Sequence, residues 1–482
     1  MSDKRQQSRY SAINVAIVGH TNAGKTSLIR TLLRNDRFGQ IDEAAGTTRY
    51  VEKSAVFAGE DAVLNLYDTP GFEDSSALLQ ALEAFSKTPE ARSQATNSAT
   101  VRLPVDLLRA FITQADKFPD FEQEIKVLRQ SLNSDVLLYI IDVREPLLGK
   151  YRDEIEILSK AGKPILPVFN FIAGNSKALQ RWRDQMAQFN LHAALEFDTV
   201  AFDFEAEKRL YQKLQSLLER FYETLQILID YRQDVWQSLN YAAARRIFQL
   251  ITEVACYRRE ISSGETSGDK AEGRAGVSHN SVIGMQDFVR DAEQRTLQDL
   301  LSLFAFNQID IDLQQLAVTD GQWQLDIFSP HMLKDFGLNA GATALSGAAA
   351  GAGLDLMVGG MSLGAATMLG AALGAGLATV RRYKQELTAA LRGHKWLCVD
   401  DNTISLLYLR QRKLLHTLTQ RGHAAQSKLQ VFNDREHSLP RSWYKVIRIL
   451  RQNSEWQDTS STDAEYQRLQ AQIIDWLLND EQ

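Results

Sequence analysis

Apolar and polar positions in the first two hundred residues switch repeatedly between strand-like and helix-like patterns. A continuous apolar run predicts a buried parallel strand at 136–141, a run rich in β-branched residues predicts a buried strand at 13–18, and a further strand is expected at 163–169. Two alternating segments predict an antiparallel hairpin at 51–57 and 62–67. Apolar residues spaced by three and four predict helices at 28–33, 121–132 and 153–159. Strands that alternate with helices indicate an α/β domain over residues 12–203, with a doubly wound and mostly parallel sheet.

After residue 203 the pattern becomes mostly helical. Large apolar residues recur every three or four positions from 205 to 260 without glycine or proline, which predicts one or two long helices. Further helices are expected at 281–303, 404–416 and 463–478, and Trp396 to Val399 is either a short strand or a buried segment. We therefore expect a polar tail at 1–11, the α/β domain at 12–203, and a mostly α-helical C-terminal domain at 204–482.

Residues 336–380 stand apart because glycine and alanine dominate them and Asp355 is their only charged residue. Glycines recur four positions apart, which places them on one helix face and lets two helices approach closely. This spacing predicts a hairpin of two helices with a turn near 355–360. The second helix, 356–380, would span about 37 Å, enough to cross a bilayer. Two interpretations stay open: a buried hairpin in a soluble domain, or contact with the inner membrane through 336–380.

Composition and charge limit the classes of partner. The 482 residues are 44% hydrophobic and 24% charged, as in an ordinary folded protein of two or three domains. A net charge of −6 argues against an extensive basic surface for binding nucleic acid. No DNA partner is therefore expected, and an RNA partner is disfavoured. The two cysteines and the polar N-terminus, which lacks the apolar core of a secretory signal, favour a cytoplasmic protein.

A glycine-containing motif lies between the first strand and the first helix. Residues 19–27 read Gly-His-Thr-Asn-Ala-Gly-Lys-Thr-Ser, the P-loop pattern in its proper context of strand and helix. Glycines let the backbone wrap around phosphate oxygens, and backbone N–H groups at the helix N-terminus bind the anion. Lys25 would reach the β- and γ-phosphates, and the Thr26 hydroxyl would bind Mg²⁺. A chance match in a turn is the alternative. The expected nucleotide-binding residues are Gly19, Asn22, Ala23, Gly24, Lys25, Thr26 and Ser27.

A second motif, Asp68-Thr69-Pro70-Gly71, ends the second strand of the expected hairpin. An aspartate at that end of a strand, opposite the P-loop, can hold Mg²⁺ through water, and the N–H of Gly71 can bind a γ-phosphate. The alternative is a plain turn. The position of this motif, about fifty residues after the P-loop, favours a nucleotide-sensing switch over a plain turn.

The P-loop, the segment Gly46-Thr47-Thr48-Arg49 and the Asp68–Gly71 motif together resemble small GTPases of the Era and TrmE type. The resemblance covers about residues 12–203 and implies binding of GTP and GDP. It also implies that one threonine of the pair Thr47-Thr48, with Thr48 favoured, closes onto Mg²⁺ and the γ-phosphate. The residues acting in hydrolysis would then be Lys25, Thr48 and Gly71. The resemblance further implies that Asn22 helps to hold a potassium ion. The alternative is that Asn22 only stabilises the loop. A dimer through this domain would be another source of catalytic help.

The sequence departs from this family at three places. Phe72 stands where Ras-type proteins carry the glutamine that orients the attacking water, so hydrolysis should be slow without a cation, a partner or another residue such as Glu73 or Asp74. The segment at 75–119 makes the connection from the Asp68–Gly71 motif to the next strand longer than is usual in small GTPases, which suggests an insertion with helical ends. The guanine-reading motif keeps Asn170 but has Phe171 for its lysine and Ala173 for its aspartate. Guanine preference over adenine therefore stays open.

Nearly the full length resembles bacterial GTPases that carry the C-terminal domain of domain-of-unknown-function family 3482. The segments that support this resemblance are 19–26, 127–130, 142–146, 170–171, 336–380 and 397–401. Three functions remain open. The first is a GTPase that cleaves the β–γ phosphoanhydride of GTP and switches the conformation of the C-terminal domain, either at a membrane or away from one. The others are a catalytically weak nucleotide-binding scaffold and an Era-like factor associated with RNA or the ribosome.

Overall fold

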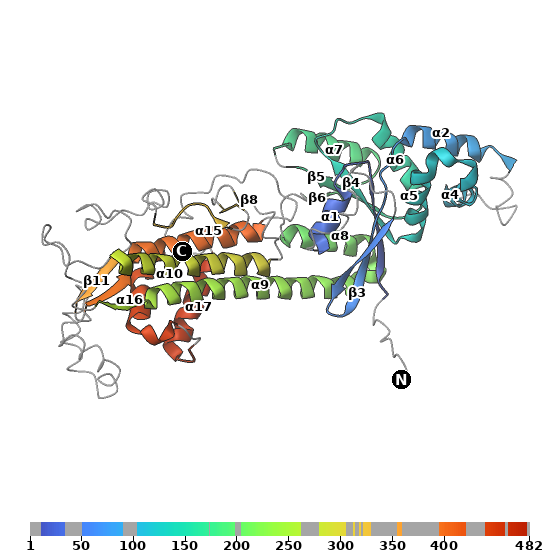
Figure 1. Ribbon diagram of the computed structural model, residues 1–482. Helices are drawn as coiled ribbons and strands as arrows, with labels where there is room; N and C mark the ends of the chain where they lie inside the picture. Colours follow the sequence, from blue (N-terminus) through green and yellow to red (C-terminus); the bar gives the residue numbers. More distant parts are fainter. Residues whose placement is uncertain are drawn as a thin grey trace, which may run out of the picture. The chain divides into compact units, whose positions relative to one another are not determined.

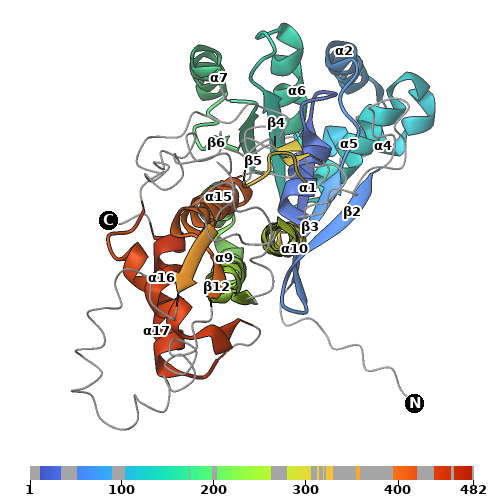
Figure 2. The same cartoon turned by 60° about the vertical axis from the view of Figure 1, so that its left-hand side comes forward.

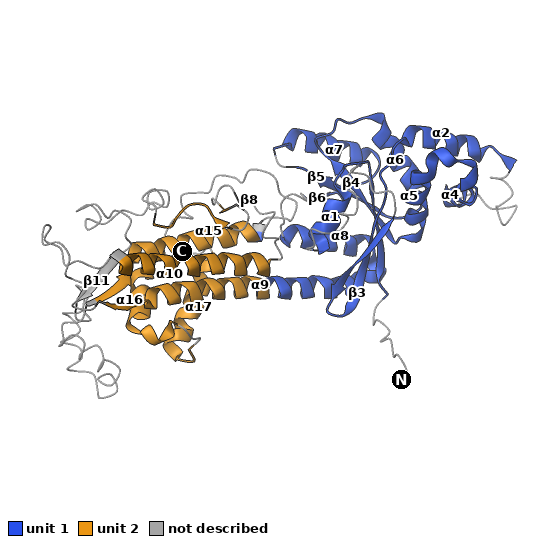
Figure 3. Cartoon of the chain, viewed as in Figure 1, with its two compact units in different colours: residues 1–237, 419–428 blue, residues 238–418, 429–482 orange. Residues whose placement is uncertain are grey.

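The computed structural model describes residues 11–33, 51–89, 104–172, 174–197, 204–261, 279–304, 312–313, 318–319, 322–328, 354–358, 395–420, 439–457 and 461–479. The chain forms two compact units (Figure 3). Unit 1 comprises Met1–Gln237 and Thr419–Lys428, and unit 2 comprises Ser238–Leu418 and Leu429–Gln482. Helix α9 (Tyr222–Cys256) contributes residues to both units.

Unit 1 is built on a six-stranded sheet with the strand order β2-β3-β1-β4-β5-β6 (Figure 1). Every neighbouring pair in this sheet is parallel except β2 and β3, which form the antiparallel hairpin expected from their alternating sequence. β4 is buried along its whole length because it lies inside the sheet, which explains its continuous apolar run. The strands are β1 (Ile13–Gly19), β2 (Glu52–Ala58), β3 (Asp61–Asp68), β4 (Val136–Asp142), β5 (Ile165–Asn170) and β6 (Leu195–Glu196).

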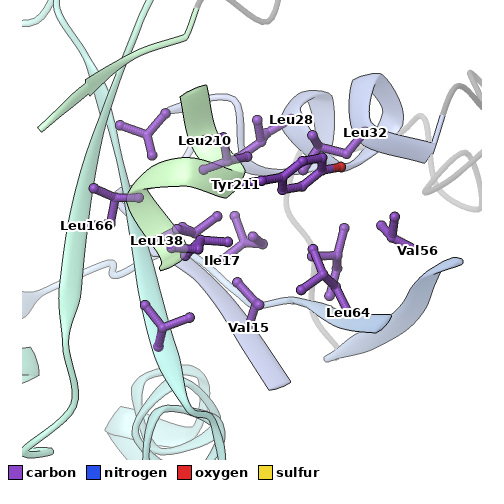
Figure 4. Packing of buried hydrophobic residues seen from close by; sticks show 14 of the residues in the cluster. Val15, Ile17, Leu28, Leu32, Val56, Leu64, Leu138, Leu166, Leu210 and Tyr211 are labelled. Carbon is purple, nitrogen blue, oxygen red and sulfur yellow. The ribbon is translucent and has the colours of Figure 1, made fainter. Parts of the chain in front are cut away.

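Helices cover both faces of this sheet, and alternate residues of β1 divide between the two cores. Val15 and Ile17 pack with α1 and α8 on one face (Figure 4). Ala16 and Val18 pack on the other face with α2, α4, α5, α6 and α7. The predicted doubly wound α/β fold is therefore confirmed. The helices are α1 (Lys25–Leu33), α2 (Ser75–Ser86), α4 (Pro104–Thr113), α5 (Glu122–Asn133), α6 (Gly149–Ser159), α7 (Ser176–Gln188) and α8 (Phe204–Leu217).

The longer segment after the Asp68–Gly71 motif is helical at both ends. α2 begins after Asp74, whose side chain accepts a hydrogen bond from the backbone N–H of Ala77 and so caps the helix. α4 and two short 3₁₀ turns, Ala115–Lys117 and Pro119–Phe121, lead into α5. Residues 90–103, in its middle, lie outside the described part of the chain. Leu78, Phe85 and Phe111 anchor these helices in the core on one face of the sheet.

Unit 2 is mainly helical, as predicted for the C-terminal part of the chain. The second half of α9 runs beside α10, and α10 runs beside α15 (Figures 1 and 2). Ion pairs join these helices: Arg246 contacts Asp299, Arg295 contacts Glu253, and the buried Arg410 contacts Glu293. The other helices of unit 2 are α10 (His279–Leu303), α15 (Asp401–Gln420), α16 (Trp443–Gln452) and α17 (Ala464–Leu478), with a 3₁₀ turn at Ser454–Trp456.

Short strands accompany the helices of unit 2, and one of them corrects the sequence prediction. β11 (Leu354–Val358) pairs antiparallel with β12 (Lys395–Val399), which also pairs with β7 (Arg259–Ile261). The sequence predicted the turn of a helical hairpin near 355–360. This prediction is wrong for residues 354–358, because they form a strand that pairs with a distant part of the sequence. A second small sheet joins β8 (Asp312–Leu313), β9 (Val318–Thr319) and β10 (Gln322–Trp323).

The remainder of the glycine- and alanine-rich segment, 336–353 and 359–380, lies outside the described residues. Among the residues that the structure does describe, no helix combines the length and the apolar composition that a membrane crossing requires.

Candidate nucleotide-binding site

The residues predicted to bind phosphate form a tight loop between β1 and α1. Asn22 and Gly24 both have positive φ angles, 63° and 97°. A Cβ atom on Gly24 would lie 2.2 Å from Nδ2 of Asn170, so a side chain has no room there. α1 begins at Lys25, and the N–H groups of a first helical turn have no partner within their own helix. The loop thus has the shape and the dipole of an anion-binding site.

Lys25 is held inside this loop. Its Nζ donates hydrogen bonds to the carbonyl oxygens of Gly19 at 3.2 Å and His20 at 2.9 Å. Burial lowers the pKa of Lys25 from 10.5 to about 8, although the carboxylates of Asp68 and Glu154 oppose this shift. Burial therefore destabilises the charged form of the Lys25 side chain, and an anionic ligand beside it would stabilise that form.

Thr26 and Asp68 meet although they lie on different elements. The register of β1 with β3 places Asp68 opposite Ile17, at the carboxyl end of the parallel strands. The Thr26 hydroxyl donates to Oδ2 of Asp68 at 2.6 Å. A hydroxyl oxygen and a carboxylate oxygen are ligands that Mg²⁺ prefers. These two residues therefore fit a magnesium site next to the phosphate loop.

The residues after Asp68 lie directly against the loop. Thr69 donates through its hydroxyl to the carbonyl oxygen of Ile17 at 2.7 Å. A Cβ atom on Gly71 would lie 2.4 Å from Oγ1 and 2.6 Å from the backbone of Thr21, so only glycine fits in this arrangement. The N–H of Gly71 therefore belongs to a segment that touches the phosphate loop.

Phe72 is fully buried and pairs with His20 in a single parallel β-bridge. Its ring packs in the core on the face of α2, α5 and α6, so it anchors the segment and does not face a water molecule. Glu124 accepts hydrogen bonds from the backbone N–H groups of Glu73 and Asp74, both at 3.2 Å. Because the Asp74 carboxylate caps α2, it is already engaged in a structural contact.

Asn170 links the phosphate loop to the loop after β5. Its Nδ2 donates to the carbonyl oxygen of Ala23 at 3.0 Å, and its Oδ1 accepts from the backbone N–H of Phe171 at 2.9 Å. Both groups of the buried amide therefore have partners, and the fold brings Ala23 to Asn170 from a distant part of the sequence. Among the other predicted residues, Ser27 lies in the first turn of α1, whereas Thr48 and Ala173 lie outside the described residues.

A partly buried cluster of polar side chains beside the loop was not predicted from the sequence. Nδ1 of His20 lies 3.0 Å from Oε1 of Glu154, and Nε2 of His20 lies 2.8 Å from Nζ of Lys150. Because an ammonium group only donates, Nε2 accepts and Nδ1 carries the proton toward Glu154. Tyr139 donates to the other Glu154 oxygen at 2.8 Å, and burial raises the pKa of this phenol. The one clue in the sequence is an acidic residue at a core-facing position of the helix at 153–159.

These features define a P-loop GTPase domain followed by a helical region. Residues 14–171 match the family described as "50S ribosome-binding GTPase". Residues 183–478 match the family described as "Domain of unknown function (DUF3482)". The second match covers more than half of the chain, and the chain therefore belongs to the DUF3482 family. The match of residues 14–171 to a GTPase family supports a GTP-binding protein.

Two curated relatives each match less than a third of this chain. GTPase Der of Nautilia profundicola is 31% identical over 149 residues, which are 30% of this chain and 29% of that protein. The tRNA modification GTPase MnmE of Streptococcus gordonii is 28% identical over 135 residues, which are 28% of this chain and 27% of that protein. This chain thus spans less than a third of the length of these relatives.

Two solved structures are similar to parts of the chain. One is Era in complex with MgGDPNP and nucleotides 1506–1542 of 16S ribosomal RNA, with a TM-score of 0.26, 21% identity, and coverage of 39% of this chain and 51% of that chain. The other is the G domain of the T. maritima FeoB iron transporter, with a TM-score of 0.21, 15% identity, and coverage of 46% and 99%.

Proposed function

We propose that this protein is a GTPase that hydrolyses GTP to GDP and phosphate, and that its nucleotide state alters the helical C-terminal domain. The observation that carries the proposal is the convergence of Lys25, Thr26 and Asp68 at one end of the parallel strands. Lys25 lies within the loop, and the Thr26 hydroxyl lies 2.6 Å from Asp68. The domains proposed from the sequence are 12–203 and 204–482, whereas the compact units divide between Gln237 and Ser238 because α8 packs in the core of unit 1.

Each residue has a distinct task in the proposed reaction. Lys25 binds the β- and γ-phosphates, and the N–H of Gly71 binds the γ-phosphate. Thr26 would hold Mg²⁺ directly, Asp68 through water, and Thr48 would complete the set. When bound, Mg²⁺ neutralises charge on the β- and γ-oxygens. Gly19, Ala23, Gly24 and Ser27 shape the loop and present backbone N–H groups.

We expect Asp68→Asn to weaken the apparent affinity for Mg²⁺ by about 10- to 100-fold, the range typical of residues that orient metal ligands. Asparagine keeps the shape of aspartate and can still accept from Thr26, so the change removes mainly the negative charge. The measurement is GTP turnover against magnesium concentration. Asp61→Asn, at the other end of the same strand, is the matched control. An unchanged magnesium midpoint in Asp68→Asn would remove Asp68 from the proposed site.

The proposed reaction needs help in activating water, because the buried Phe72 cannot orient it. We propose that Asn22, which is exposed and has a positive φ angle, holds a potassium ion beside the phosphates. Replacing Na⁺ with K⁺ should then raise the hydrolysis rate at least about tenfold, a small part of the 10³–10⁵ that an arginine finger supplies. Asn22→Gly keeps the backbone angle and should abolish the difference. Equal rates in both salts with the unchanged protein would reject this role.

The test of the proposed function is phosphate release by the full chain with excess GTP. We expect more phosphate than protein in moles, and none above background with Lys25→Met. The buried Phe72 also favours a second candidate, a nucleotide-binding scaffold without turnover. GTP binding with less than one phosphate released per protein would select the scaffold. An Era-like role with RNA, a dimer through the GTPase domain and membrane contact through 336–380 remain predictions.

A further inference from the structure

The loop after β5 presents an aromatic ring to the phosphate loop. β4 and β5 pair in parallel, so Asp142 and Asn170 end these strands side by side. Phe171 follows with a φ angle of 57°, which is unusual for a residue other than glycine. Two hydrogen bonds hold this backbone: the N–H of Phe171 donates to Oδ1 of Asn170, and the carbonyl oxygen accepts from Nδ2 of Asn175. Such angles persist where the surroundings impose them, often at ligand sites.

The Phe171 ring is fixed between two neighbours. Its tip, Cζ, lies 3.6 Å from the position that a Cβ atom on Gly24 would occupy, so the ring borders the phosphate loop. The Arg144 guanidinium lies 3.7 Å from the ring centre. Arg144 is held in turn by Asp142, through Nε at 2.9 Å from Oδ1 and Nη2 at 2.7 Å from Oδ2. A cation held over an aromatic face stabilises the ring in place.

This arrangement suits a flat aromatic ligand that is attached to a phosphate chain. Bases stack on aromatic side chains with little regard to their identity, because every base has a π-face. Recognition of guanine over adenine needs acceptors for its N1–H and amino group, and carboxylates supply them best. Residues 170–175 contain no Asp or Glu. The loop thus offers a stacking surface without a charged guanine acceptor.

We propose that Phe171, backed by Arg144, is the surface on which the nucleobase stacks, and that the site binds guanine and adenine triphosphates with similar affinity. This inference rests on the proposed function, since it assumes a triphosphate in the phosphate loop. Phe171 is then a residue that sets base specificity, and the specificity is for a purine rather than for guanine alone.

The test is equilibrium binding of GTP, ATP and inorganic tripolyphosphate to the full chain with Mg²⁺. For the unchanged protein we expect the Kd values for GTP and ATP to differ by less than about tenfold. Phe171→Gly removes the ring and adopts the positive φ angle without strain. It should weaken GTP and ATP alike by between about fivefold and 100-fold, the range for loss of one stacked base. Tripolyphosphate should bind unchanged, which also shows that the loop is intact.

Two further variants make the test sharper. Phe171→Trp should bind GTP and ATP about as tightly as the unchanged protein does, because indole stacks at least as well as phenyl. Phe57→Ala removes another exposed phenyl ring, on β2, and should change nothing.

Three results would overturn the inference. One is a preference for GTP over ATP above about tenfold. Another is loss of tripolyphosphate binding in Phe171→Gly to the same degree as loss of GTP, since the ring would then support the loop rather than the base. Unchanged GTP and ATP affinities in Phe171→Gly would exclude stacking. All of these leave the proposed function standing, whereas failure of the unchanged protein to bind any of the three ligands overturns both.

Discussion

Lys25→Met should lower the affinity for GTP·Mg²⁺ by at least about 100-fold. The expected loss corresponds to two hydrogen bonds from a charged group, each contributing about 1.5–3 kcal/mol. Methionine is similar in length and suits the buried position of Lys25, so the variant should fold. The measurement is calorimetric titration at pH 7. Affinity within a few-fold of the unchanged protein would mean that Lys25 does not touch the phosphates.

The same side chain predicts how binding depends on pH. The lowered pKa of Lys25, about 8, means that the nucleotide-free protein loses the ammonium charge as the pH rises above 8. GTP affinity should then fall by about tenfold between pH 7 and pH 9, because the neutral amine must first take up a proton. The contribution to stability has the opposite sign. Between pH 8 and 10.5 the unfolded state binds more protons at this group, so its contribution to the free energy of unfolding rises with pH. Lys25→Met should show neither dependence.

Gly19→Ala should destabilise unit 1 by about 3–5 kcal/mol, from a strained backbone angle and an overpacked core. Gly19 has a φ angle of 141°, and an added Cβ would lie 2.5 Å from the carbonyl oxygen of Ile140 on β4. That carbonyl belongs to the backbone at the centre of the sheet, so it cannot move without opening the contact between β1 and β4. The measurement is urea unfolding of the full chain, followed by circular dichroism.

Gly162→Ala is the matched control. Gly162 also has a positive φ angle, 64°, but nothing lies within 4 Å of the position of its Cβ. The control substitution should lower the free energy of unfolding by only about 1 kcal/mol, which is the strain of the positive φ angle alone. Equal losses in both variants would show that the contact with Ile140 has no energetic weight.

The sheet and the loop geometry of the candidate phosphate-binding site were largely predictable, because the residues concerned carry strong local signals. The continuous apolar run of β4 is possible only for a strand covered on both faces. The glycines and the lysine of residues 19–27 have few uses other than holding an anion between a strand and a helix. Once β1 and β3 are paired in parallel, Asp68 must lie beside Thr26.

The rest depends on contacts between distant residues, which no local pattern reveals. The spacing of its helix places Glu154 on the core-facing side, but only the packing of α6 shows that its partners are His20 and Tyr139. The stacking of Arg144 on Phe171 depends on the adjacent ends of β4 and β5. Leu354–Val358 is apolar except for Asp355, and the glycines around it suggest a helical hairpin. Only its pairing with β12 identifies it as a strand.

The central claim, that residues 19–27 hold a triphosphate with Mg²⁺, is tested most directly by titrating GTP into the nucleotide-free chain in a calorimeter. We predict saturable binding to one site per chain, with heat that largely disappears when magnesium is removed or when Lys25 is methionine. A flat trace with GTP and with ATP, from protein that circular dichroism shows to be folded, would contradict it.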